Sequence, residues 1–166
     1  MKLTSKILLI GIIAGALTTS CKKEQCTEPV PEMSFLEFYQ SGQDTNEFRL
    51  VFKFNDCDGD IGMESTGSIL DEEGAVQTTN FKIDLYYYAD DQWNLHVFQS
   101  EDGLNSKIPP LGNSTKNPIL DGEVEKILGR YTSLGGYDTI MFKSRILDNA
   151  GHYSNLVETP GFSLSK

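Results

Sequence analysis

The segment Asp56–Gly62, which reads Asp-Cys-Asp-Gly-Asp-Ile-Gly, carries the side chains best suited to chemistry. It places Asp56, Asp58 and Asp60 at alternate positions, and Gly59 lets the backbone turn between them. Three carboxylates crowded into a tight loop repel one another, and a divalent cation relieves that repulsion. Their hard oxygen atoms favour Ca²⁺, whereas Mg²⁺ is less suited to a crowded, flexible cage. The spacing therefore predicts a structural calcium site; the alternative is a solvated acidic turn without metal.

The loop is not an EF-hand, which reads Asp-x-Asp-x-Asp-Gly with a bidentate glutamate at position twelve. Ile61 stands in place of the glycine and Gly67 in place of the glutamate, so further ligands must come from elsewhere. We expect Ile61 to plug the space beneath the loop. Asp148 follows a strand expected at 139–147, and in an immunoglobulin-like sandwich this strand ends beside the acidic loop. The predicted metal ligands are Asp56, Asp58, Asp60 and Asp148, with Glu64 as a further ligand, either direct or through water.

Apolar and polar residues alternate through the rest of the chain, and no window shows a helical stripe. The predicted strands are 33–40, 47–54, 80–89, 93–99, 122–128, 139–147 and 152–164, the last bent at Pro160-Gly161. The connection 55–79 is expected to be a loop with a turn at 71–74. About seven short strands separated by turn signals predict an all-β fold, an immunoglobulin-like β-sandwich with Greek-key connections, as one domain over 33–166.

Residues 1–20 have the pattern of a secretory signal peptide. Lys2 and Lys6 form a positive region before the apolar stretch 7–17, which is shorter than the about 20 residues needed to span a bilayer. The small residues at 18–20 before Cys21 resemble a bacterial lipobox, which implies cleavage before Cys21 and lipidation of that cysteine. The alternative is an ordinary signal peptide followed by a chance cysteine.

Residues 21–32 are predicted to form a lipidated, flexible tether. Acyl chains on Cys21 would anchor the protein to a membrane, and we expect the outer membrane. The sequence after Cys21 resembles the charged tag of surface-exported lipoproteins, and the alternative is a solvated linker on the periplasmic side.

Loss of Lys2 and Lys6 with the signal takes the net charge from −10 to −12. A chain this acidic is repelled by phosphate backbones, which argues against nucleic-acid partners.

The two remaining cysteines lie in different surroundings. Cys26 belongs to the tether and Cys57 to the acidic loop. An exported compartment permits a disulfide between them. Because their contexts differ, we instead expect Cys57 to be a loop filler that points away from the metal, with the pairing as the alternative.

Tyr86 and Tyr88 share the outward face of the strand predicted at 80–89. They form either a binding surface for a sugar ring or protein partner, or cross-strand pairs with residues of the neighbouring strand that shield the sheet face. The sequence has no Gly-x-Ser-x-Gly elbow, no zinc spacing and no phosphate-binding glycine loop. We therefore predict a protein that is not an enzyme, with a small hydrolase as the alternative.

Two segments resemble motifs of small Bacteroidetes-type lipoproteins with immunoglobulin-like domains. Residues 54–62 resemble their Asp-x-Asp-Gly-Asp-Ile-Gly signature, and 145–155 resemble their ending, with Asn149 and His152 departing from it. The resemblance implies the fold and the envelope location and supplies no activity. Together with the residues above, it leads us to expect a membrane-anchored, calcium-stabilised, non-catalytic binding or scaffold module. Its ligand would be a glycan or an envelope protein, and the alternative is an assembly lipoprotein without a soluble ligand.

Overall fold

The computed structural model describes residues 26, 29–41, 47–100, 102–111, 119–129 and 134–164. The predicted signal peptide and the lipidation of Cys21 lie outside these residues. The described part of the chain is nearly all β. It contains no helix long and apolar enough to cross a membrane.

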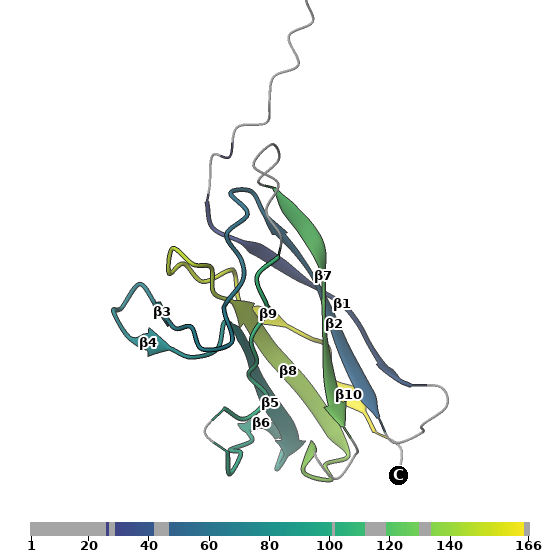
Figure 1. Ribbon diagram of the computed structural model, residues 1–166. Helices are drawn as coiled ribbons and strands as arrows, with labels where there is room; N and C mark the ends of the chain where they lie inside the picture. The colour runs from purple at the N-terminus through teal and green to yellow at the C-terminus, as the bar shows by residue number, and fades with distance from the viewer. Residues whose placement is uncertain are drawn as a thin grey trace, which may run out of the picture.

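Two antiparallel sheets form the two layers of a sandwich (Figure 1). In order, the first sheet contains β1 (Glu32–Gln40), β2 (Phe48–Asp56) and β7 (Leu120–Gly129). The second contains β10 (Phe162–Ser163), β8 (Thr139–Ile146), β5 (Phe81–Ala89) and β6 (Gln92–Leu95), while β9 (Val157–Glu158) also pairs with β8. A separate hairpin joins β3 (Ile69–Leu70) to β4 (Val76–Gln77). The predicted all-β sandwich is confirmed.

The core lies between the two sheets and is built from alternate residues of the long strands. The rings of Phe52 on β2 and Phe81 on β5 meet edge to face, with centroids 5.9 Å apart. Burial of these apolar side chains is the main stabilising force of the layers. The inward-facing residues of β2, β5 and β8 include Phe48, Leu50, Phe52, Phe54, Phe81, Ile83, Leu85, Ile140, Phe142 and Ile146.

Each of the seven predicted strands has a counterpart in the structure. The last is divided into β9 and β10 on either side of Pro160-Gly161, as the predicted bend requires. The connection 55–79 was expected to be a loop, yet it contains the β3–β4 hairpin. Its turn lies where predicted, because the N–H of Gly74 donates to the carbonyl of Asp71 at 2.8 Å. Each strand of this hairpin has two residues, too few to produce a visible alternation.

The ends of β2 and β8 position the candidate site. Asn55, near the end of β2, lies opposite Glu32 at the start of β1. The end of β2 and the start of β1 therefore lie together at one end of the sandwich (Figure 1).

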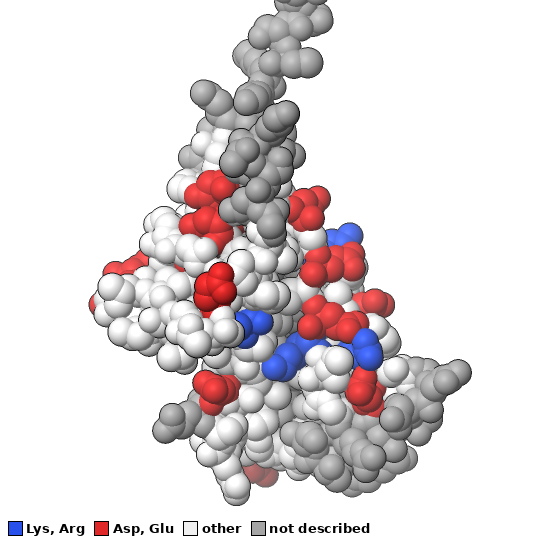
Figure 2. All heavy atoms as spheres, viewed as in Figure 1, with Lys and Arg blue, Asp and Glu red and all other residues white. Residues whose placement is uncertain are grey.

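On the face shown in Figure 2, acidic side chains are widely spread and basic ones are few, in keeping with the net charge of −10.

Candidate metal centre

The acidic loop folds back on itself directly after β2. Asp56, the last residue of β2, is fully buried, and its Oδ2 accepts a hydrogen bond from the N–H of Ile61 at 3.0 Å. Gly59 has φ +72°, the left-handed conformation that glycine adopts readily. As a result, carboxylate oxygens of Asp56, Asp58 and Asp60 lie within 4.8 Å of one another. The structure thus brings together three of the four predicted ligands.

Each of these three carboxylates has an oxygen without a partner. The Oδ1 atoms of Asp56, Asp58 and Asp60 are buried and accept no hydrogen bond from the described residues. A buried anionic oxygen without a partner is costly. Three such atoms within one loop form an all-oxygen donor set, which fits a hard cation such as Ca²⁺.

The pKa values of these groups reflect their crowding. Burial raises the pKa of Asp58 to about 6, and a hydrogen bond with Asp56 and the negative charges of Asp60 and Asp56 contribute. Burial also raises the pKa of Asp60, as do the charges of Asp148 and Asp56. Both shifts mean that the loop resists full ionisation when no cation is bound.

This crowding predicts an unusual pH dependence for the metal-free protein. The pKa of Asp58 is about 6 in the folded state, above its ordinary value of 3.8. Between about pH 4 and about pH 6 the native state therefore binds more protons than the unfolded state does. Stability in chelator should therefore fall as pH rises from about 4 to about 6. Thermal melts of the wild type and of Asp58→Asn across this range measure the effect. The variant should show a shallower fall, and equal slopes would contradict the assignment.

Asp148 lies beside the three-aspartate group without joining it. It is fully buried, its Oδ1 accepts the N–H of His152 at 2.7 Å, and its Oδ2 lies 3.2 Å from Nδ1 of the same residue. Its charge nevertheless acts on Asp60, and hydrogen bonds from the N–H groups of Ala150 and Asn149 lower the pKa of Asp60. The turn after β8 therefore reaches the acidic loop as expected, and it contacts Asp60 through its backbone N–H groups. Asp148 itself closes the turn.

The cysteines correct one prediction. Cys26 and Cys57 form a disulfide with Cα atoms 5.3 Å apart, so the expectation that Cys57 is only a loop filler is wrong. The physical reason is the pairing of Glu32 with Asn55, which brings the segment before β1 past the end of β2. Sequence reasoning treated that segment as a free tether and so missed its return to the loop.

Two residues after the aspartates fix the loop to the rest of the domain. Ile61 is 2% exposed and belongs to the main apolar core, as predicted for a plug. Gly62 has φ +143°, and a Cβ on it would lie 2.6 Å from the Cα of Pro110. The backbone at Gly62 therefore packs directly on the segment that contains Pro110.

Gly62→Ala is expected to destabilise the fold by about 1–3 kcal/mol, because the new methyl group meets backbone and φ is unfavourable. Urea denaturation measures the change. Gly74→Ala is the matched control, since Gly74 has φ +79° but nothing within 4 Å of the added atom. An equal loss in both variants would mean that packing against Pro110 contributes nothing.

The predicted aromatic surface lies at the other end of β5. Phe81 at the start of β5 pairs with Ile146, whereas Tyr88 pairs with Trp93 near the β5–β6 turn. Tyr88 is 46% exposed, and its ring meets that of Trp93 edge to face at 5.2 Å. Lys143 lies 5.1 Å from the ring centroid of Tyr86. Both tyrosines are accessible to some extent, and each lies beside a side chain of a neighbouring strand.

Comparisons of the chain with protein-family models, curated proteins and solved structures find no match. The chemistry of the site itself is therefore the guide to function. Its donors are carboxylate oxygens, and neither histidine nor cysteine belongs to the group found among the described residues. This set suits Ca²⁺ and lacks the ligands that zinc prefers.

Proposed function

We propose that this protein is a membrane-anchored, calcium-stabilised, non-catalytic module with an immunoglobulin-like fold that acts in binding or scaffolding at the cell envelope. One observation carries the calcium assignment: buried, unpartnered oxygens of three aspartates in a single tight loop. The strand order β1-β2-β7 opposite β10-β8-β5-β6 supports the immunoglobulin-like assignment.

The ion would order the acidic loop, and the Asp60 carboxylate of that loop would in turn link the two sheets by accepting hydrogen bonds from the turn after β8. The acidic loop continues from β2 in one sheet, and the Asn149–Ala150 turn continues from β8 in the other. For an extracellular-type site with a Kd on the order of 10⁻⁴ M, millimolar calcium adds about 1.4 kcal/mol of stability. That free energy is sufficient to order a loop.

Envelope location rests on the lipobox-like sequence before Cys21 and is supported by the Cys26–Cys57 disulfide. Disulfides persist in exported proteins and are rare in reducing compartments. Lipid on Cys21 would hold the domain at the outer membrane, where a glycan or an envelope protein is the expected partner. Detergent-phase partitioning of the full-length protein and of Cys21→Ser tests the anchor, since only the wild type should enter the detergent phase.

The calcium site is tested by melting temperature in chelator and in millimolar CaCl₂. The wild type should gain about 5 °C, the shift that corresponds to 1.4 kcal/mol for a domain of this size. Asp58→Ala should show no gain. Asp84→Ala, which removes an exposed aspartate on β5, should respond as the wild type does. A wild type with no calcium-dependent gain would overturn the proposal.

A further inference from the structure

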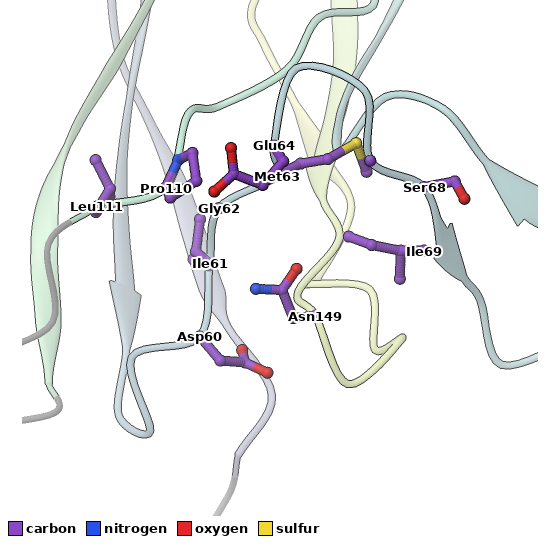
Figure 3. Close-up of a pocket in the computed structure, with 11 residues that line it drawn as sticks. Asp60, Ile61, Gly62, Met63, Glu64, Ser68, Ile69, Pro110, Leu111 and Asn149 are labelled. Atoms are coloured by element: carbon purple, nitrogen blue, oxygen red, sulfur yellow. The ribbon is translucent and has the colours of Figure 1, made fainter.

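A pocket of about 300 Å³ lies beside the acidic loop (Figure 3). Asp60 and Asn149 lie toward one end of it and Glu64 toward the other, with Ile61 between them. Asp60 is shared between this pocket and the candidate metal centre. The described residues that line the pocket are Asp60, Ile61, Gly62, Met63, Glu64, Gly67, Ser68, Ile69, Pro110, Leu111 and Asn149.

The polar lining selects against charged ligands. Its ionisable groups are the carboxylates of Asp60 and Glu64, and the described lining residues include no lysine or arginine. Lys107 is nearby, but its ammonium group donates to the carbonyls of residues 64, 65 and 67. Among the described lining residues an anion would meet the carboxylates of Asp60 and Glu64 and no positive charge, whereas a cation would compete with the metal ion proposed at Asp60. A neutral ligand avoids both penalties.

The remaining walls are apolar. Met63 and Ile69 are buried side chains of a small cluster, and Pro110 and Leu111 lie across the pocket from Ile69 (Figure 3). Apolar walls with a few convergent polar groups are typical of small-ligand sites. A sugar ring has C–H faces that match the walls. Its hydroxyls can donate to carboxylates and accept from the amide of Asn149.

The pocket is formed in advance of any ligand. Lys107 holds the 64–67 turn through three hydrogen bonds of 2.6 to 3.2 Å. The N–H of Met63 donates to the carbonyl of Ile108 at 2.8 Å, and Gly62 packs against Pro110. A rigid site loses little entropy when it binds, which favours recognition of a small ligand.

We propose that this pocket binds one neutral pyranose unit of a glycan. Asp60, Glu64 and Asn149 would recognise its hydroxyls, and the apolar walls would cover one face of the ring. The inference rests on the proposed function, because bound calcium is what disfavours cations at Asp60. It names the ligand class that the binding module would take, at the metal end of the sandwich rather than at Tyr86 and Tyr88.

Binding is tested on the full-length protein in 5 mM CaCl₂ by saturation-transfer NMR and a glycan array. The neutral NMR probes are the methyl glycosides of mannose, galactose and glucose. The two charged probes are the anion glucuronate and the cation Nα-acetyl-lysine methylamide. At least one neutral glycoside should bind, and the two charged probes should not. Absence of neutral-sugar binding in both assays, or preferential binding of a charged probe, overturns the inference.

Variants locate the binding. Asn149→Ala removes the side-chain amide but keeps the backbone N–H that reaches Asp60, and Asn149→Trp places a bulky ring in the pocket, because the Asn149 side chain points toward Ile61 (Figure 3). Each should weaken sugar binding at least tenfold while the calcium-induced rise in melting temperature remains. Ser100→Trp, on an exposed loop outside the pocket lining, is the control and should bind as the wild type does. Sugar binding that survives Asn149→Trp places the site elsewhere and overturns the assignment.

The two proposals fail in distinguishable ways. A calcium-dependent melting temperature without sugar binding overturns the pocket assignment and leaves the metal centre standing. Sugar binding that Asn149→Ala abolishes, in a protein without a calcium response, supports the pocket and overturns the metal centre. If neither a calcium-dependent melting temperature nor sugar binding is observed, both the metal centre and the pocket assignment are overturned.

Discussion

Replacing Cys26 and Cys57 together by serine is expected to lower the free energy of unfolding by about 3–4 kcal/mol. The disulfide joins residues 31 positions apart, and closing a loop of that length restricts the unfolded chain by this amount in the chain-entropy model. Urea denaturation of the oxidised wild type and of the double variant, both in chelator, measures the difference. Chelator keeps any contribution from calcium out of the comparison.

The same substitution should also weaken calcium binding, by at least fivefold. Cys57 lies between Asp56 and Asp58, so the disulfide fixes the backbone that presents both carboxylates. Titration calorimetry on the double variant and on the reduced wild type should give the same weakened affinity. Unchanged affinity would mean that the hydrogen bond from Ile61 to Asp56 orders the loop without help from the disulfide.

Asp56→Asn is expected to stabilise the protein in chelator and to destabilise it, relative to the wild type, in calcium. In chelator the variant should be more stable than the wild type by about 1 kcal/mol, because it removes a fully buried charge from a group of three carboxylates. This gain is smaller than the about 1.4 kcal/mol that millimolar calcium adds to the wild type. The asparagine oxygen can still accept the N–H of Ile61. In millimolar calcium the wild type should become the more stable protein, since the variant lacks one anionic ligand. Thermal melts of both proteins in chelator and in calcium measure this change in the order of stability.

A matched control separates this effect from loss of negative charge in general. Asp84→Asn removes a charge from the exposed face of β5 and should change stability little in either condition. If Asp56→Asn destabilises the protein in chelator as well, Asp56 acts chiefly through its hydrogen bond to Ile61. The carboxylate group would then not be under electrostatic strain.

The long strands could be predicted from the sequence because most of their large apolar side chains lie on one face. On β2, Phe48, Leu50, Phe52 and Phe54 are all buried, and the intervening Lys53 is exposed. A period of two is therefore visible in the residues themselves. The three aspartates could be predicted for a similar reason, since their spacing and Gly59 are local properties of one short segment.

What the sequence did not reveal depends on contacts between distant segments. The disulfide requires β1 to begin beside the end of β2, a register that no local pattern encodes. The position of Asp148 was predicted, but its oxygens accept from His152, and the contact with Asp60 comes from backbone N–H groups, which every non-proline residue carries. The pocket beside the loop joins segments near residues 60, 68, 110 and 149, and their proximity follows from the completed fold.

The disulfide also sets how the domain would respond to a mechanical load on its N-terminus. β1 is an edge strand that pairs with β2, and both lie between Cys26 and Cys57. A pull applied before Cys26 passes through the disulfide to Cys57 and leaves β1 and β2 without tension, so the edge strand is not peeled away. The force enters the sandwich through the loop that carries Asp58 and Asp60, and distortion of that loop is the first expected step of forced unfolding.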